Sequence, residues 1–273
     1  MKVLPVLIAA VIALYALVVA VFYLAQRRFL YFPTRTYVPL SEAHANPALR
    51  EISLRTADGI ELKSWYAPAT SQPFTVVFFH GNADSLYGSA PVADPYIAAG
   101  YGFLLTEYRG YSGLAGAPTE AGAYDDARAN LNWLLAHGVE SGGIILLGQS
   151  LGSGVATEMA AEYQAGGLML LSPFLSIPKI ARVHYSFFPA QILAMDRFDN
   201  ERKIGRIHMP VLIVNGDKDE VIPAAQGREL YTLANQPKEF HSLSGLGHND
   251  TFDEFAPLSL DWIERTCEGT QSR

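Results

Sequence analysis

The chain opens with one long apolar run, after which short apolar segments alternate with longer amphipathic ones. Residues 3–25 carry no charge. As a helix at about 1.5 Å per residue they would be about 34 Å long, enough to cross a bilayer core of about 30 Å. We therefore expect residues 1–28 to form an N-terminal anchor that crosses the membrane once. The alternatives are a buried helix and a cleaved signal peptide, although the run is long for a signal peptide and has only a poor cleavage site at Val18 and Ala20.

Beyond residue 28, the apolar segments have the length and composition of strands. Two alternating segments, 51–56 and 60–68, are separated by a turn sequence and predict an antiparallel hairpin. Helical stretches separate the later segments, and this alternation predicts an α/β fold with a mostly parallel sheet of about eight strands flanked by helices. The six later strands are expected at 75–80, 102–108, 143–148, 167–172, 211–216 and 238–243.

Residues 173–209 interrupt this regular alternation between two successive strands. The segment contains three prolines and several aromatic residues. It predicts a small cap over the carboxyl edge of the sheet, where ligands bind in open α/β folds. For any one of its apolar side chains, ordinary core packing is the simpler interpretation. The side chains concerned are Phe187, Phe188, Ile192 and Leu193.

Composition and charge exclude some classes of function. The 273 residues, 49% of them hydrophobic, can bury one large core. There are 20 Lys and Arg against 27 Asp and Glu and no basic stripe, so we expect no nucleic-acid partner. A single cysteine, Cys267, excludes an intramolecular disulfide, and the histidines lack metal-ligand spacing, so we expect no metal site.

The charges that flank the apolar run bear on its orientation. Lys2 precedes the run, whereas Arg27, Arg28 and Arg35 follow it. Positive residues concentrate on the cytoplasmic side of a membrane helix. The pattern slightly favours a catalytic part on the cytoplasmic side.

A serine between two glycines follows one of the predicted strands. The sequence IILLGQSLGSG places Ser150 between Gly148 and Gly152, directly after an apolar run. This is the G-x-S-x-G pattern of a nucleophile elbow, in which a sharp strand-to-helix turn needs close neighbours without side chains. The alternative is that Ser150 only caps the helix that follows it.

A serine hydroxyl needs a general base and an acid that orients the base, and in this type of fold the acid and the histidine follow the serine in that order. His248 lies in a glycine-rich loop after the last predicted strand, and Asp217 and Asp219 both follow strand 211–216. Spacing alone does not choose between the two aspartates. Asp217 lies in the turn itself, where a carboxylate commonly accepts backbone N–H bonds, which favours Asp219 as the orienting acid.

A tetrahedral intermediate also needs two donors for its oxyanion. The backbone N–H of Leu151, next to the serine, is one candidate, and the loop HGNAD after strand 75–80 offers Asn82, with Ala83 as the second choice. In the same region we interpret His80 as a side chain that braces this loop, and Arg109 as an ion-paired loop residue.

Several of these motifs together resemble a known family. FFHGNA, EYRGYSG, GQSLGSGVA, PVLIVNGDKDEVIP and GLGHND, with LYFPTR after the apolar run, resemble the α/β-hydrolase superfamily. Within it, they are similar to the YfhR/Bem group of membrane-anchored serine hydrolases, which is related to depalmitoylating thioesterases. The resemblance implies an α/β-hydrolase domain over residues 29–273 with its cap at about 173–209. One departure is Glu107, where the group's turn is expected to carry Asp.

The resemblance also implies roles for individual residues. Carried over position by position, it makes Ser150 the nucleophile, Asp219 the acid and His248 the base, with Asn82 and Leu151 lining the oxyanion hole. It implies no cofactor.

The expected activity is hydrolysis of a carboxylic ester or thioester bond through an acyl-enzyme. The expected substrate is a small-molecule or lipidated acyl compound at the membrane. Two alternatives remain: an amidase or peptidase with the same triad, for which a cap of about 37 residues is small, and a non-catalytic binding protein on the same fold.

Overall fold

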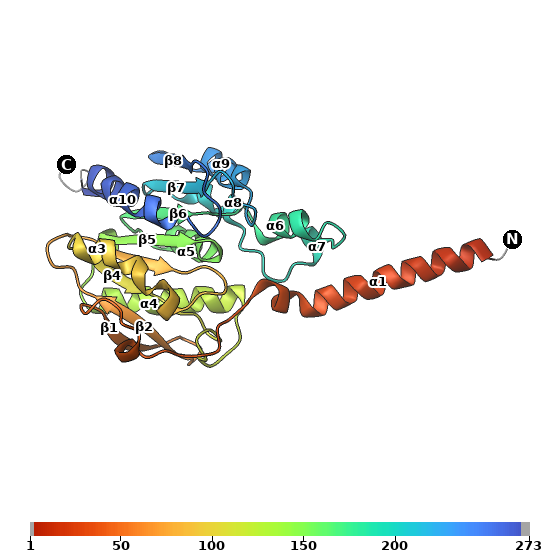
Figure 1. The fold of residues 1–273 in the computed structure, drawn as a ribbon, viewed down its shortest axis with the longest axis horizontal. Helices are drawn as coiled ribbons and strands as arrows, with labels where there is room; N and C mark the ends of the chain where they lie inside the picture. The colour runs from red at the N-terminus through yellow and green to blue at the C-terminus, as the bar shows by residue number, and fades with distance from the viewer. Residues whose placement is uncertain (1–2, 269–273) are drawn as a thin grey trace.

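Eight strands form one sheet at the centre of the chain, in the order β1-β2-β4-β3-β5-β6-β7-β8 (Figure 1). The computed structural model describes residues 3–268. β2 is antiparallel to both of its neighbours, and every other pair is parallel. The strands are β1 (Arg50–Arg55), β2 (Glu61–Ala67), β3 (Thr75–Phe79), β4 (Gly102–Leu105), β5 (Ile144–Gln149), β6 (Gly167–Leu171), β7 (Val211–Gly216) and β8 (Lys238–Leu243). The predicted hairpin and mostly parallel sheet are confirmed.

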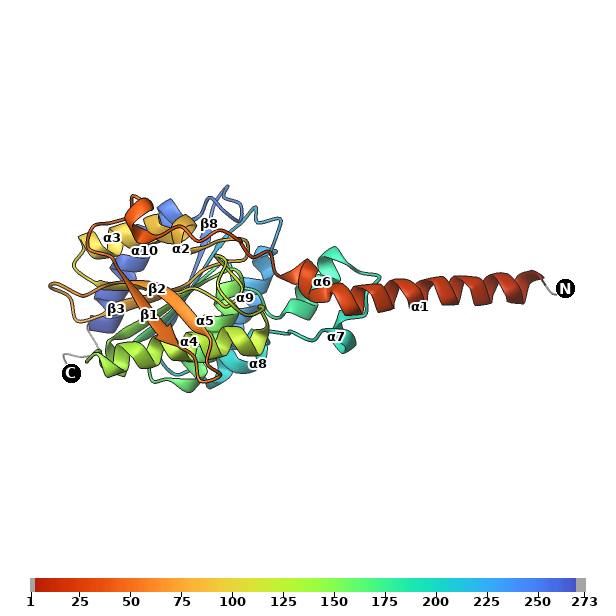
Figure 2. The same cartoon turned by 90° about the horizontal axis from the view of Figure 1, so that it is seen from below.

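Helices cover both faces of this sheet (Figure 2). One face carries α4 (Glu120–Ala136), α5 (Leu151–Glu162), α8 (Asn200–Lys203) and α9 (Ala224–Leu233). The other carries α2 (Leu86–Ser89), α3 (Asp94–Ala98) and α10 (Phe252–Trp262), which continues as the π-helical segment η5 (Ile263–Glu268). Four short 3₁₀ segments complete the elements: η1 (Leu40–Glu42), η2 (Ala90–Ala93), η3 (Ser141–Gly143) and η4 (Ile204–Arg206).

The two-sided cover explains the unbroken apolar runs of the central strands. Along β5, Ile144 and Leu146 pack into the core on the α4–α5 side, whereas Ile145 and Leu147 pack into the core on the α3–α10 side. All four side chains are buried. A strand covered on both faces has no polar face to present to water, so its sequence is apolar throughout.

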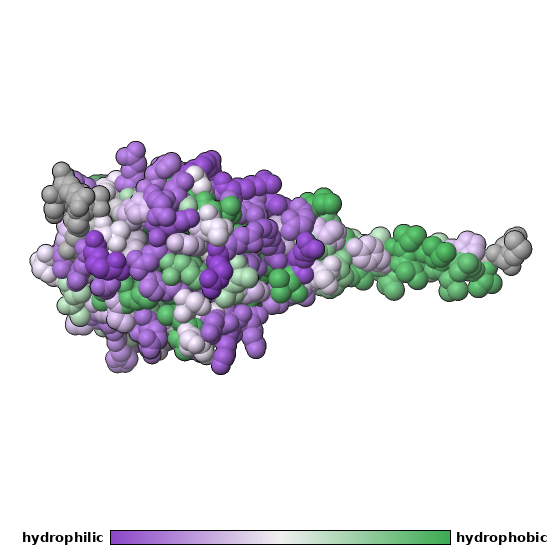
Figure 3. All heavy atoms as spheres, turned by 90° about the horizontal axis from the view of Figure 1, so that it is seen from above, coloured by the Kyte–Doolittle hydropathy of each residue, from purple (hydrophilic) through white to green (hydrophobic). Residues whose placement is uncertain are grey.

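The N-terminal helix α1 (Val3–Leu30) projects from this domain (Figures 1 and 3). Among residues 3–268 it is the one helix long and apolar enough to cross a membrane, which is compatible with a membrane anchor. It continues five residues past the uncharged run, and the next residue, Tyr31, is buried in the core of the domain. The helix and the α/β domain therefore join without an intervening flexible linker.

The predicted cap contains α6 (Ile177–His184), α7 (Ala190–Leu193), α8 and η4, inserted between β6 and β7. α6 and α7 lie beside the inner end of α1 (Figures 1 and 2). Core packing is the correct interpretation for Phe188, but it is wrong for Phe187 and Ile192, which are 44% and 82% exposed. Leu193 is half-buried. The cap thus presents apolar side chains outward, next to the apolar helix.

Candidate active site

Ser150 occupies a strained turn between β5 and α5. Its backbone has φ 52° and ψ −118°, which a residue with a side chain adopts at a cost of about 1–3 kcal/mol. The flanking glycines allow this turn, because a Cβ on Gly152 would lie 1.9 Å from the Phe79 carbonyl oxygen and one on Gly148 would lie 2.7 Å from the Cβ of Ala156. The Ser150 side chain does not cap α5, so the alternative role as a simple helix cap is wrong.

The hydroxyl of Ser150 instead faces a histidine. His248 Nε2 lies 3.0 Å from Ser150 Oγ, and His248 Nδ1 lies 2.7 Å from Asp219 Oδ2. The Asp219 carboxylate is fully buried, and the His248 ring is 11% exposed. The three side chains come from loops after β5, β7 and β8, which all end at the carboxyl edge of the sheet.

The structure separates the two candidate aspartates. Asp219 Oδ1 accepts hydrogen bonds from the backbone N–H groups of Val221 and Ile222, at 2.9 and 2.7 Å, which leaves its other oxygen for His248. Asp217 does not contact the histidine. Its Oδ1 accepts a 2.7 Å bond from the N–H of Gly245, in the loop that leads to His248. Asp217 therefore accepts a backbone N–H bond, as its place in the turn predicts, and the structure shows that the donor is in the histidine loop.

The loop after β3 lies against the elbow. A Cβ on Gly81 would lie 3.4 Å from the Cβ of Ser150, so the loop backbone passes beside this serine. Of the two candidate donors that follow, the N–H of Ala83 is already bonded to the side-chain oxygen of Asn82, at 3.0 Å. The N–H of Leu151, at the first position of α5, has no partner within its helix. Leu151 thus directly follows Ser150, and Asn82 directly follows Gly81, whose backbone lies beside Ser150.

The side chain of Asn82 makes a connection that the sequence did not suggest. Its amide donates to the carbonyl of Leu30, the last residue of α1, and its oxygen accepts from the N–H of Phe32 at 2.9 Å. The hydroxyl of Tyr111 donates to the same oxygen at 2.8 Å. The loop beside Ser150 is therefore hydrogen-bonded to the end of the apolar helix.

His80 and Glu107 form a buried pair behind this loop. His80 Nε2 lies 2.7 Å from Glu107 Oε1, and Nδ1 lies 2.7 Å from the carbonyl oxygen of Gly81. Both ring nitrogens thus face acceptors. Burial opposes protonation of the ring, but the Glu107 carboxylate and these bonds outweigh it and raise the pKa of His80 above its ordinary value.

Glu107 does more than pair with His80. Its second oxygen accepts from the N–H of Leu86, at 3.1 Å, and from the hydroxyl of Ser112. The carboxylate therefore joins the turn after β4 to the start of α2. Glu107 stands at the position where the family resemblance leads us to expect Asp. The interpretation of His80 as a brace for the loop is confirmed.

Arg109 is ion-paired, as its sequence context predicts. The guanidinium lies 2.6 Å from Asp58 and 2.8 Å from Asp126. These ion pairs link the turn between β1 and β2, the turn after β4 and the helix α4. No group of three or more His, Cys, Asp or Glu side chains within residues 3–268 is placed to hold a metal ion.

Comparison with known proteins places this geometry in a family. A family model described as "Serine aminopeptidase, S33" matches residues 71–200. The chain is 37% identical to an uncharacterised protein of Mycobacterium tuberculosis over 262 residues, 94% of this chain and 93% of that one. It is 33% identical to protein bem46 of Schizosaccharomyces pombe, over 76% of this chain and 73% of the relative. The chain belongs to the Bem46-type family of α/β-hydrolases.

Further relatives agree with this assignment. Human alpha/beta hydrolase domain-containing protein 17B is 32% identical over 72% of this chain and 68% of its own length. An esterase of Pyrococcus furiosus has the same fold, with a TM-score of 0.71 at 18% identity over 87% of this chain and 98% of that one. A puromycin-hydrolyzing peptidase of Mycobacterium tuberculosis matches with a TM-score of 0.69 at 17% identity, over 84% of this chain and 41% of that one. The predicted α/β-hydrolase fold is confirmed, and the protein is a hydrolase.

Proposed function

We propose that this hydrolase cleaves the ester or thioester bond of an acylated substrate through an acyl-enzyme on Ser150. The observation that supports the proposal most is the contact chain from Ser150 through His248 to Asp219, with the serine on a strained elbow. Such strain at this half-buried turn costs the fold free energy, whereas it aims a nucleophile at the carboxyl edge of the sheet.

In the first half of the reaction, Ser150 Oγ attacks the substrate carbonyl carbon while its proton passes to His248 Nε2. The resulting imidazolium donates from Nδ1 to Asp219, whose buried carboxylate stabilises the charge. The carbonyl oxygen becomes an oxyanion and accepts bonds from the N–H groups of Leu151 and Asn82. Collapse of this intermediate breaks the ester or thioester bond, and His248 returns the proton to the leaving alcohol or thiol.

In the second half, water replaces the leaving group. His248 takes a proton from the water as it attacks the acyl carbon on Ser150, and the same two N–H groups hold the second oxyanion. When this intermediate collapses, the bond to Ser150 breaks, the serine recovers its proton from His248, and the carboxylic acid leaves. The chemistry needs no group beyond those at the site and water.

An amidase or peptidase activity is the second candidate. The matching family model carries the name of a serine aminopeptidase, and one structural neighbour is a peptidase. The same triad cleaves amides when the site protonates a leaving amine and holds the peptide beside the nucleophile. The small cap favours the ester or thioester, because its apolar side chains offer few polar partners for a peptide.

We further propose that α1 crosses the membrane once and that the substrate is a lipid or lipidated molecule presented at the bilayer. The 28 residues of α1 are apolar up to the last two turns, where Gln26, Arg27 and Arg28 begin the polar surface. The arginines at this end favour a catalytic domain on the cytoplasmic side. Cleavage by an added protease in sealed vesicles of known orientation tests the side.

Active-site labelling tests the reaction. The full-length protein in detergent is treated with a fluorophosphonate and then assayed with matched esters, thioesters and amides of one acyl group. The proposal expects an adduct on the peptide that contains Ser150 and faster turnover of esters and thioesters than of amides. Labelling with turnover of amides alone would support the peptidase, and absence of labelling would contradict a serine hydrolase.

A further inference from the structure

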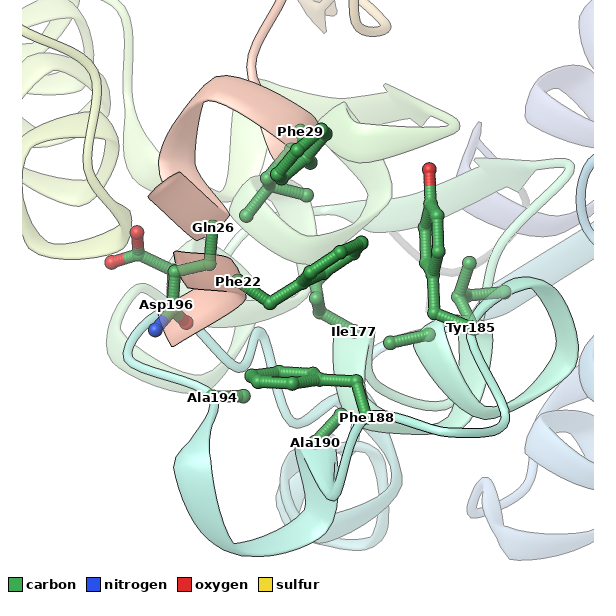
Figure 4. Close-up of a pocket in the computed structure, with 12 residues that line it drawn as sticks. Phe22, Gln26, Phe29, Ile177, Tyr185, Phe188, Ala190, Ala194 and Asp196 are labelled. Carbon is green, nitrogen blue, oxygen red and sulfur yellow. The ribbon is translucent and has the colours of Figure 1, made fainter. Parts of the chain in front are cut away.

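An apolar pocket lies between the inner end of α1 and the cap (Figure 4). Its volume is about 120 Å³. Figure 4 shows the ring of Phe22 between those of Phe29 and Phe188, with Tyr185 opposite. The ring of Phe22 lies 4.9 Å from that of Phe29 and 5.9 Å from that of Phe188. The supposed anchor therefore forms one wall of a cavity in the catalytic domain.

Polar contacts hold the two walls together. The side-chain oxygen of Gln26 accepts a 2.8 Å bond from the N–H of Met195, and its nitrogen donates to the carbonyl of Leu193 at 3.3 Å. Arg27 pairs with the nearly buried Asp196 at 2.8 Å. Because the polar lining groups Gln26 and Asp196 have partners in these contacts, they do not require a polar ligand. The remaining lining is mostly aliphatic and aromatic carbon.

The pocket lies at the level where a bilayer would meet the protein. A core of about 30 Å takes about 20 helical residues, so a span that begins near Val3 ends near Phe22. The hydroxyl of Tyr15, within that span, donates to the carbonyl of Phe187 in the cap at 3.0 Å. Phe187 and Ile192, two of the exposed apolar residues of the cap, lie in the same part of the fold. The side of the pocket at Phe22 and the cap then faces hydrocarbon, whereas Gln26 and Leu30 lie beyond the end of the span.

The other end of the pocket is connected to the loop beside Ser150 through the side chain of Asn82. Leu30 lines the pocket, and its carbonyl accepts the bond from the Asn82 amide. Asn82 follows Gly81, whose backbone passes beside Ser150. One continuous set of contacts thus leads from the membrane side of the cap to the candidate oxyanion loop.

We propose that this pocket binds the alkyl chain of the acyl substrate, which enters from the bilayer along α1 while its carbonyl is held at Ser150. The proposal rests on the acyl-hydrolase function above. A cavity of about 150 Å³ lined by aliphatic and aromatic carbon holds a benzene ring, so a pocket of about 120 Å³ holds a short length of chain. Each methylene buried there improves kcat/KM by about fourfold, the equivalent of about 0.8 kcal/mol.

A pocket-filling variant tests the chain-length effect. Ala181 lines the pocket from α6, whereas Val183, two positions on, is 53% exposed and outside the lining. We compare full-length A181F, the matched control V183F and the unchanged protein in detergent on a series of esters from butanoyl to dodecanoyl. The long-to-short ratio of kcat/KM should fall at least tenfold in A181F and stay within about twofold in V183F. An unchanged ratio in A181F would overturn the proposal.

A second measurement reads the position of the chain directly. A long-chain alkyl fluorophosphonate with a terminal diazirine is attached to the unchanged protein: Ser150 Oγ forms a bond to phosphorus as fluoride leaves. Light then expels nitrogen from the diazirine, and the carbene inserts into a neighbouring bond. Mass spectrometry should find the cross-links in peptides that contain Phe22 to Leu30 or Ile177 to Ala194. Cross-links confined to other peptides would overturn the proposal.

These outcomes separate the two proposals. If Ser150 is not labelled by any fluorophosphonate, the hydrolase mechanism fails. A second outcome is that Ser150 is labelled and short esters are turned over, while the long-to-short ratio of kcat/KM is unchanged in A181F and no cross-link lies in the pocket peptides. In that case only the pocket proposal fails. A diazirine phospholipid serves as the control for a structural lipid. Cross-links from this lipid at the pocket, with none from the serine-bound chain, would assign the cavity to a bilayer lipid and overturn the acyl site.

Discussion

The carboxyl edge of the sheet and the junction between α1 and the cap are assembled from different kinds of interaction. At the edge, each important side chain lies within a few residues of a strand end, so its position follows from the strand. At the junction, residues about 170 positions apart meet, as in the pair Arg27–Asp196 and the contact of Tyr15 with Phe187. The edge is thus specified by short sequence motifs, and the junction by packing between distant segments.

The loop of Asn82 belongs to both regions. It follows β3 at the edge, yet its side chain bonds to Leu30 and Phe32 at the junction. This contact extends the interpretation of the apolar helix, which is compatible with a membrane anchor and also contacts the loop beside Ser150. Five predictions test how far the edge and the junction depend on each other.

The largest effect is expected at the edge. We expect S150A to lower kcat by about 10⁶, because the nucleophile and its partners act as a unit. Single-turnover and steady-state assays on a soluble ester measure the loss, and a fluorophosphonate should leave the variant unlabelled. Because this variant is expected to be inactive, thermal unfolding serves as the check that it is folded. Retained labelling would mean that another residue is the nucleophile.

The two aspartates should differ strongly. In D219N the histidine loses its charged partner, and we expect kcat to fall by about 10⁴. In D217N an amide replaces the acceptor of the Gly245 N–H, so only the histidine loop is loosened and the loss should be much smaller. Paired kcat measurements at one pH decide between them. A larger loss of kcat in D217N than in D219N would mean that Asp217, and not Asp219, orients the histidine.

The link between the regions should have an intermediate effect. Loss of an oxyanion donor costs about 10²–10³ in kcat, but N82A keeps its backbone N–H and loses only the side-chain bonds to Leu30, Phe32, Tyr111 and Ala83, so we expect a loss of about tenfold. Y111F, which removes one of the bonds to Asn82, is the matched control and should lose less. If N82A has normal kcat, the junction does not support the oxyanion loop.

The buried pair behind the loop should appear in the pH dependence of stability. The pKa of His80 is raised in the folded state. Its protonated pair with Glu107 therefore stabilises the fold fully below the unfolded pKa of about 6.5, and this contribution is lost as pH rises through the folded pKa. We expect Tm to fall over that range, and E107Q to flatten the fall. E239Q, at the exposed His241 pair, is the control. If Tm falls with pH as steeply in E107Q as in the unchanged protein, the pair of His80 and Glu107 is not the cause of the fall.

The smallest effect is expected at the junction itself. In R27Q the half-exposed ion pair with Asp196 is lost, although Asp196 still accepts a bond from the N–H of Glu120. Exposed pairs contribute about 0–1 kcal/mol, which corresponds to at most about 2–4 °C in Tm for a domain of this size. R28Q removes the same charge one residue on. Equal shifts in the two variants would mean that net charge, and not the pair, is responsible.

Much of the fold could be read from local sequence patterns. Unbroken apolar runs identified strands covered on both faces, and the local preference for Thr at a helix N-cap applies at Thr119, whose side chain accepts from the N–H of Gly122 at the start of α4. The glycines around Ser150 predicted a turn too tight for side chains, and the Cβ positions at Gly148 and Gly152 confirm it. These features depend on residues next to one another in the chain.

Only the tertiary structure decided which distant groups meet. Asp217 and Asp219 follow the same strand, and the choice between them depends on where the loop after β8 places His248. Phe22, Gln26 and Phe29 share one face of α1, yet nothing in an apolar run indicates that this face meets a cap 150 residues later. By itself, the sequence determined the strands, the elbow and the apolar helix, because local backbone and hydrophobic pattern control these. The pairing of aspartate with histidine and the wall between helix and cap required the packed fold, because contacts between distant segments leave no local pattern.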